Sequence, residues 1–186
     1  VPTEGITKIT AADFEYANAT DHTIKLLGRS RAIDDNTAEV MVAPFLLSKE
    51  HPLAMVHGVF NAVFVTGNML GDSMYYGRGA GKLPTASAVV SDVVDCARHQ
   101  GKVIMCFWDK EEVKLADIGE AERSFFIRAK AGAEDAVTAA FPGGRMVHLK
   151  DRKEDFGYFT QSMKEKDFQA KYEALGGQML GRIRLV

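Results

Sequence analysis

The chain has 186 residues, of which 46% are hydrophobic and 26% charged, and its formal net charge is −2 at pH 7. This composition can bury a core and argues against disorder, and the small net charge argues against a nucleic-acid-binding surface. No apolar run approaches the roughly 18 residues that a membrane-spanning helix needs. Residues 1–5 carry no signal-peptide pattern. We therefore expect a cytoplasmic protein with neither a nucleic-acid nor a membrane partner.

Cysteine and histidine are too few and too scattered to suggest a metal site. The two cysteines, Cys96 and Cys106, and the five histidines show none of the usual metal-ligand spacings. Cys96 falls inside a predicted helix, and we interpret both cysteines as reduced, small buried hydrophobic residues. No metal ion is predicted.

Residues 10–76 alternate short helical and extended segments without a clean βαβ repeat. Thr10 can cap a short helix that follows it, and Ser48 can cap another near residues 52–56. β-branched and aromatic residues favour strands at 23–27, 38–47, 58–66 and 73–76, with turns at 34–36 and 67–68. The pattern predicts a mixed α/β layer.

The clearest helix lies just beyond residue 81. Its apolar residues recur at steps of three and four, which predicts a continuous buried stripe on one helix face. Pro84 fits the first helical turn, where its missing N–H costs nothing. The stripe consists of Leu83, Ala86, Val90, Val93 and Ala97.

The charge balance changes sign near residue 123. Residues 1–123 contain 12 Lys+Arg and 17 Asp+Glu, whereas residues 124–186 contain 11 and 8. This shift predicts two units joined by the charged segment 109–123 as a linker. Beyond the linker, strands are predicted at 124–129, 145–149, 156–161 and 179–186, with helices near 133–141 and 165–175. The βαββαβ order is that of a ferredoxin-like unit, and Ser162 with Glu165 forms a capping-box pattern before the second helix.

The sequence Gly77-Arg-Gly-Ala-Gly81 joins a predicted strand to the clearest helix. Glycines let the backbone adopt positive φ and come close to a ligand. Free N–H groups at the helix start suit an anion or a ribose-phosphate edge, and Arg78 could add charge. A plain turn with glycines for packing explains the same residues equally well. The pattern is not a GxGxxG fingerprint, and no general acid or base stands out elsewhere.

Several segments along residues 1–98 form one ordered pattern. They are Glu4-Gly-Ile6, Ile24-Lys-Leu-Leu-Gly28, His51-Pro-Leu-Ala54, Gly58-Val-Phe-Asn-Ala-Val63, Tyr76-Gly-Arg-Gly-Ala-Gly81 and Leu83-Pro-Thr-Ala-Ser-Ala-Val-Val90. Ile9, the Asp13 helix and Asp92 belong to the same pattern, which resembles the catalytic domain of homoserine dehydrogenase. Residues 124–186 are similar in pattern to the ACT regulatory domain that many bacterial members of that family carry.

The resemblance implies an α/β (α+β) architecture with three parts. Residues 1–108 would be a mixed-sheet portion of the catalytic (substrate) domain, 109–123 a linker, and 124–186 a ferredoxin-like βαββαβ ACT domain. It also implies reduction of L-aspartate 4-semialdehyde to L-homoserine with NADPH or NADH, in threonine and methionine biosynthesis. The nucleotide-binding domain and the catalytic lysine are expected upstream, so no catalytic residue is expected in this chain and the chain alone is expected to be inactive.

The resemblance assigns possible cofactor contacts to the glycine turn. Gly81 matches the family position that touches the nicotinamide cofactor from the substrate-domain side. Gly79 and Ala80 adjoin it, and Thr85 at the helix start is a further candidate. A wall made of glycine backbone would let the cofactor lie close to the aldehyde in a near-attack geometry.

The ACT resemblance implies an amino-acid effector such as threonine. In that family an Asp-x-Pro-Gly-like loop helps to bind the effector, but here the loop is Lys130-Ala-Gly-Ala-Glu134, in which only Gly132 is retained. Two alternatives therefore stay open: an amino-acid-sensing module, and a dimerisation module whose strands pair across subunits. A homo-oligomer, either a dimer or a tetramer, is expected.

Overall fold

The computed structural model describes residues 1–102, 105, 107–108 and 110–186, so Cys106 and Asp109 of the predictions lie outside the described residues. The chain divides into two compact units. Unit 1 comprises residues 1–49 and 112–186, and unit 2 comprises residues 50–111. The two units are described separately below.

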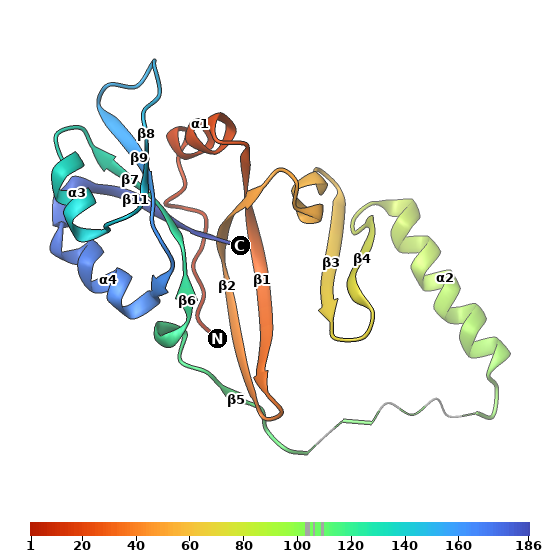
Figure 1. The fold of residues 1–186 in the computed structure, drawn as a ribbon. Helices are drawn as coiled ribbons and strands as arrows, with labels where there is room; N and C mark the ends of the chain where they lie inside the picture. Colours follow the sequence, from red (N-terminus) through yellow and green to blue (C-terminus); the bar gives the residue numbers. More distant parts are fainter. Residues whose placement is uncertain (103–104, 106, 109) are drawn as a thin grey trace. The chain divides into compact units, whose positions relative to one another are not determined.

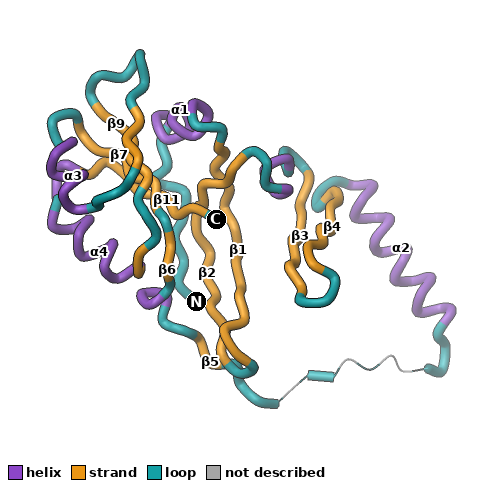
Figure 2. Tube along the Cα trace, in the orientation of Figure 1, coloured by secondary structure: helices purple, strands orange, loops and turns teal. Residues whose placement is uncertain are grey.

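One large mixed sheet organises unit 1 (Figures 1 and 2). Its strand order is β1-β2-β11-β7-β9-β8, and a short strand β5 pairs with β2. All neighbours are antiparallel except that β2 runs parallel to β11 and to β5. The bounds are β1 His22–Asp34, β2 Thr37–Ser48, β5 Lys114–Leu115, β7 Phe125–Lys130, β8 Arg145–Val147, β9 Asp155–Phe159 and β11 Met179–Leu185. These strands confirm the extended segments predicted in both halves of the chain.

Helices pack on both faces of this sheet. Strand β7 alternates, so that Phe125 and Ile127 face a core shared with α3 (Glu134–Ala140) and α4 (Glu165–Ala174). Phe126 faces the opposite core, beneath α1 (Ala11–Ala19). Short 3-10 turns at Ile118–Glu120 and Gly176–Gln178 and a two-strand pair, β6 (Glu122–Arg123) with β10 (Met163–Lys164), complete the unit. Residues 1–49 and 112–186 therefore share one sheet and its two cores.

Of the helix caps predicted in unit 1, the one at Thr10 is confirmed and the one at Ser162 is wrong. The α1 helix follows Thr10 as predicted, and the Asp13 carboxylate accepts hydrogen bonds from the Thr10 N–H and hydroxyl at 2.7 and 2.8 Å. The capping box predicted at Ser162 is absent. Helix α4 starts at Glu165 behind Lys164, and the Glu165 carboxylate is drawn away to Arg123 and Arg184.

The described part of the predicted linker contains regular structure. Strands β5 and β6 and a 3-10 turn lie between residues 114 and 123, and all of them belong to unit 1. Arg123 is buried, and its guanidinium pairs with Glu39 and Glu165. At least one charged residue of this segment therefore forms buried ion pairs within unit 1. A count of charged residues cannot distinguish such buried pairs from the solvated charges of a linker. The three-part domain assignment itself stays a prediction.

Unit 2 consists of a 3-10 turn η1 (Pro52–Met55), an antiparallel hairpin of β3 (Phe60–Gly67) and β4 (Gly71–Arg78), and α2 (Lys82–Arg98). The turn at residues 67–68 and the strand and helix predictions here are confirmed. None of the described helices of the chain is long and apolar enough to cross a membrane.

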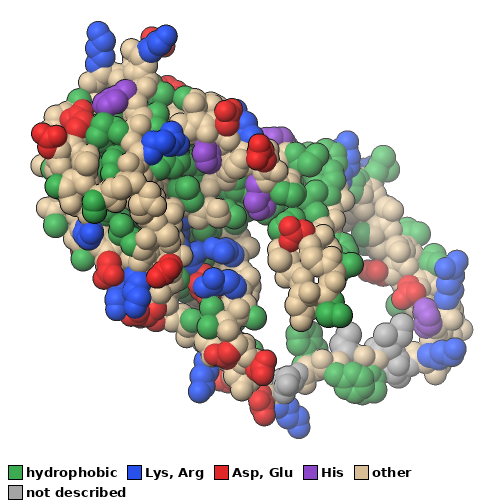
Figure 3. All heavy atoms as spheres, in the orientation of Figure 1, with side chains coloured by type: hydrophobic (Ala, Val, Ile, Leu, Met, Phe, Trp, Pro, Cys, Tyr) green, Lys and Arg blue, Asp and Glu red, His purple; other side chains and the backbone are tan. Residues whose placement is uncertain are grey.

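The buried stripe predicted on α2 is exposed in this chain. No residue of α2 is buried, and the exposed fractions of Leu83, Val90 and Val93 are 79%, 59% and 62%. Hydrophobic side chains likewise lie on the surface over β3, β4 and α2 in Figure 3. Cys96, interpreted as a buried hydrophobe, is also exposed. The helix predicted from the periodicity is confirmed, but no described segment of unit 2 buries its apolar face.

Candidate functional site

The hairpin of unit 2 sets the position of the glycine turn. In its register Phe60 lies opposite Arg78, and Asn61 lies opposite Gly77. The Phe60 ring stacks on Tyr76 with a centroid distance of 4.8 Å, and the Arg78 guanidinium carbon lies 5.1 Å from the Phe60 ring centre. The aromatic pair therefore holds the cation at the beginning of the turn.

Gly79 lies against the neighbouring strand. Its N–H donates to the Val59 carbonyl at 3.1 Å. A Cβ added at Gly79 would lie 1.4 Å from Nδ2 of Asn61, so a side chain there would need the Asn61 amide to move. Close packing against Asn61 therefore explains why residue 79 is glycine, which supports the plain-turn interpretation at this position.

Gly81 has a different reason to be glycine. Its backbone lies at φ 121° and ψ 150°, a conformation that only glycine adopts readily, and it is the N-cap of α2. The Gly81 carbonyl accepts from the Thr85 N–H at 3.1 Å, and Pro84 lies in the first turn as predicted. Ala80 links the two glycines.

The beginning of α2 is open to a ligand. It has no capping side chain and no acidic residue in its first turn. Gly79, Ala80, Gly81 and Thr85 are all exposed. Unpaired N–H groups, the positive end of the helix dipole and the Arg78 cation can together receive an anionic or polar group. The four predicted residues thus lie together at the exposed start of α2.

Gly132, the candidate effector residue, lies in unit 1 between β7 and α3. It adopts φ 92°, and its N–H donates to Oε2 of Glu134 at 2.7 Å. The backbone donor of this loop is therefore already satisfied within the loop.

The buried ion pairs in unit 1 could not be predicted from the sequence. Arg184 is 2% exposed and pairs with Glu4 and Glu165. Hydrogen bonding by Arg184 lowers the pKa of Glu4 from its ordinary 4.5 to about 2, against the opposing effect of burial. Alternating charged residues in a strand normally indicate a solvated face, so only the folded position of α4 reveals the cluster.

A second buried cluster joins α1 to the sheet. Arg128 donates to Asp13 at 2.9 Å and to Asp155 at 3.0 Å. Hydrogen bonding by Arg152, then by Tyr16 and Arg128, lowers the pKa of Asp155 to about 2 in spite of burial. Among the residues that the structure describes, no group of three or more potential ligands is arranged to hold a metal ion.

The solved structures and the curated relatives that this chain resembles belong to one class of enzyme. A crystal structure of a homoserine dehydrogenase from Thiobacillus denitrificans matches 98% of this chain and 47% of its own length, with a TM-score of 0.77 and 28% identity. This likeness confirms the mixed α/β architecture with a mixed sheet. Homoserine dehydrogenases of Synechocystis and Mycobacterium bovis are 49% identical over 98 residues and 41% identical over 150 residues, which covers 51% and 74% of this chain.

The homoserine dehydrogenase family model matches residues 1–94, which is just over half of the chain. The chain belongs to the homoserine dehydrogenase family, as the sequence resemblance predicted, and it is thus related to oxidoreductases that use NAD(P). It spans about a quarter to a third of the length of the curated relatives it matches. The match includes the whole glycine turn and Thr85 but stops well before Gly132.

Proposed function

We propose that this chain forms part of an NAD(P)-dependent homoserine dehydrogenase that reduces L-aspartate 4-semialdehyde to L-homoserine, a step of threonine and methionine biosynthesis. One observation carries the proposal: the family match, residues 1–94, includes β3, β4, the glycine turn and most of α2. Most of unit 2 therefore lies within the family match.

The proposed role of the glycine turn is to close over the cofactor. Gly81 has no side chain, so a nicotinamide ring can approach the backbone closely at the start of α2. Gly79 and Ala80 continue that surface, and Thr85 adds a hydroxyl one helical turn further on. Arg78, held by Phe60, supplies a positive charge that suits the phosphates of NADPH or NADH.

Catalysis in this proposal needs residues outside the chain. The family resemblance assigns the catalytic lysine to an upstream segment. The uncovered apolar stripe of α2 supports this view, because a helix with one apolar face normally packs against another element. The substrate-domain portion would then be residues 1–108, with a nucleotide-binding domain preceding it.

The test compares two proteins. The 186-residue chain alone should show no NADPH oxidation with aspartate semialdehyde. A chimera that joins the preceding part of the Mycobacterium bovis relative to this chain should show it. Turnover by the chain alone, or a folded chimera without activity, would contradict the proposal. Substituting Arg78→Ala in the chimera should weaken cofactor binding, with Lys102→Ala as a control for loss of an exposed charge.

A second function is favoured by the strand order of residues 124–186. The order β11-β7-β9-β8 with two helices on one face is that of a ferredoxin-like βαββαβ unit, and we propose an ACT-like domain there. Its role would be amino-acid sensing, with threonine the first candidate, or homo-oligomerisation. Because the Gly132 N–H is occupied by Glu134, the dimerisation role is the better supported of the two.

Calorimetry on the intact chain with threonine, methionine, isoleucine and lysine distinguishes these roles. Saturable heat with one amino acid would support sensing. No heat, together with a dimer or tetramer by light scattering, would support dimerisation. A strict monomer without heat would rule out both.

A further inference from the structure

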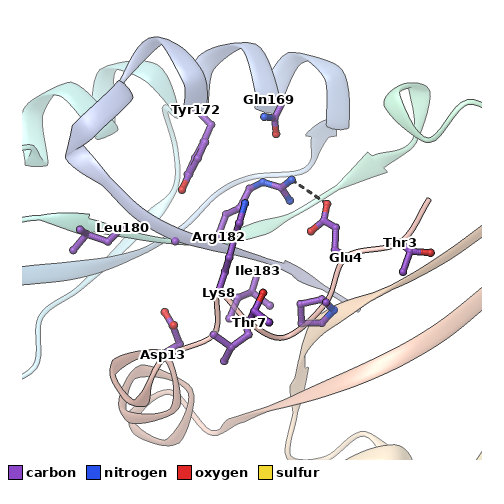
Figure 4. Close-up of a pocket in the computed structure, with 14 residues that line it drawn as sticks. Thr3, Glu4, Thr7, Lys8, Asp13, Gln169, Tyr172, Leu180, Arg182 and Ile183 are labelled. Carbon is purple, nitrogen blue, oxygen red and sulfur yellow. Dashed lines mark hydrogen bonds and ion pairs between the residues drawn. The ribbon is translucent and has the colours of Figure 1, made fainter.

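A cavity of about 700 Å³ lies inside unit 1, between the stretch that precedes α1, the edge of α4 and strand β11 (Figure 4). This volume is within the range of small-molecule sites. Figure 4 shows Glu4, Lys8, Gln169, Tyr172 and Arg182 converging on it from three elements. None of these residues belongs to the glycine turn or to the Gly132 loop, so the cavity is separate from both sites discussed above.

The cavity contains cationic donors with unused capacity. The Nη1 atom of Arg182 is buried without any hydrogen-bond partner, the single such side-chain atom among the described residues. Its other terminal nitrogen donates to Oε1 of Glu4 at 3.1 Å. Lys8 is exposed at the cavity, and within the described part of the chain its ammonium has neither an ion pair nor a hydrogen bond. A buried donor left without an acceptor costs on the order of 1–3 kcal/mol, which an acceptor group of a ligand would recover.

The acidic groups of the cavity are, by contrast, already paired. Both oxygens of Glu4 accept from Arg184, and one also accepts from Arg182. One oxygen of Asp13 accepts from Arg128, and the other accepts from Thr10. Spare donors therefore exceed spare acceptors, and an anion fits this cavity better than a cation.

The other residues that line the cavity indicate the chemistry of the rest of the ligand. Burial raises the pKa of Tyr172, so its phenol stays protonated and can donate a hydrogen bond. The apolar lining suits a short hydrocarbon chain beside a charged head group. The two paired carboxylates nearby disfavour a doubly charged ligand such as phosphate. The apolar residues are Ile9, Pro44, Leu180 and Ile183.

We propose that this cavity binds a small organic monocarboxylate, with its carboxylate on Arg182 and Lys8 and its hydrocarbon part against Ile9 and Leu180. The ligand would contact β11 and α4 from residues 163–186 and the stretch before α1 at the same time. Binding would therefore stabilise the packing of residues 1–49 on residues 112–186.

Titration of the intact chain with butyrate tests the proposal, with thermal unfolding and chemical shifts of Tyr172 and Leu180 as readouts. Butyrate should raise the unfolding temperature saturably and shift both resonances, whereas butylamine and inorganic phosphate at the same ionic strength should do neither. No saturable effect of butyrate, or an equal effect of phosphate, would overturn the proposal.

Two variants locate the binding. Lys8→Met removes an exposed and unpaired cation, so folding should be unchanged while butyrate affinity falls by about tenfold, the loss expected for one charge-assisted hydrogen bond. Lys153→Met removes an exposed lysine outside the cavity and should leave the affinity unchanged. Arg182→Met should abolish binding, and circular dichroism checks that it folds. Unchanged affinity in Lys8→Met would contradict the assignment.

Discussion

The two units of this chain use their hydrophobic and charged residues in opposite ways. Unit 1 buries aromatic side chains on both faces of its sheet and places arginines and carboxylates in paired clusters between its segments. Ala54 is the one buried hydrophobic residue among the described residues of unit 2, and this unit exposes the apolar faces of its helix and hairpin. Unit 1 can thus account for its own stability, whereas the surface of unit 2 is suited to contacts with other protein and with a cofactor.

The largest expected effect is the loss of a buried charge pair in unit 1. Arg184→Met would leave Glu4 paired with Arg182 alone and the buried Glu165 paired with Arg123 alone, and it should lower the free energy of unfolding by about 3 kcal/mol. Urea unfolding measures this change. As a control, Lys166→Met removes an exposed pair with Glu120 and should change the free energy of unfolding far less. Equal changes in the free energy of unfolding would contradict a larger contribution of the buried cluster to stability.

A smaller effect is expected where α1 packs on β9. A Cβ at Gly157 would lie 2.7 Å from the Phe126 ring and 2.9 Å from the Tyr16 ring. Gly157→Ala should therefore destabilise unit 1 by about 1–3 kcal/mol through overpacking. Gly177→Ala, where a Cβ would meet nothing within 4 Å, is the matched control. A neutral Gly157→Ala would show that α1 is packed more loosely than the structure has it.

Acid should weaken unit 1 over a defined range. Glu4 has its pKa lowered from 4.5 to about 2, and Asp155 from 3.8 to about 2. Both groups therefore contribute stability that is fully present above their ordinary pKa values and is lost as the pH falls from about 4.5 towards 2. Urea midpoints measured between pH 7 and pH 2 should fall in that window. The decrease in urea midpoint should be smaller in Glu4→Gln and the same as in the unsubstituted chain in Asp151→Asn. A Glu4→Gln variant with the same pH dependence as the unsubstituted chain would contradict a stabilising role of the ion pair between Glu4 and Arg184.

The smallest effect is expected in unit 2. Val93 is 62% exposed, so Val93→Lys should change the free energy of unfolding by less than about 0.5 kcal/mol. In the chimera with the preceding part of the Mycobacterium bovis relative, the same substitution should lower activity, because a charge would enter a covered apolar face. Ser91→Lys, on the same helix and also exposed, is the control. A large loss of stability in the chain alone would show that the stripe is already buried.

The local part of this fold could be predicted because it depends on neighbouring residues. Strand periodicity along β7, the Thr10 cap and the break before α2 are all decided within a few positions. The joining of β2 to β11 and the burial of Arg184 could not be predicted, because both depend on residues far apart in sequence. The charge shift near residue 123 was a true feature of the sequence, but it gave no hint that Arg123 is buried.

The candidate site shows the same division. The strand-turn-helix context of the glycine turn could be predicted from residues 73–90, and the family could be predicted from the ordered segments along residues 1–98. Whether a given glycine serves packing or a ligand was not readable, because it depends on what faces it. In the structure Gly79 faces Asn61, whereas Gly81 is required by its own backbone conformation.

The most direct test of the proposed cofactor contact in unit 2 is the KM for NADPH of the active chimera carrying Gly81→Val. Gly58→Val is the matched control, because Gly58 also has positive φ, at 62°, and lies outside the turn. The account predicts a KM for NADPH raised by about tenfold in Gly81→Val, relative to Gly58→Val, with the KM for aspartate semialdehyde changed much less. An unchanged KM for NADPH would contradict the assignment of this turn to the cofactor.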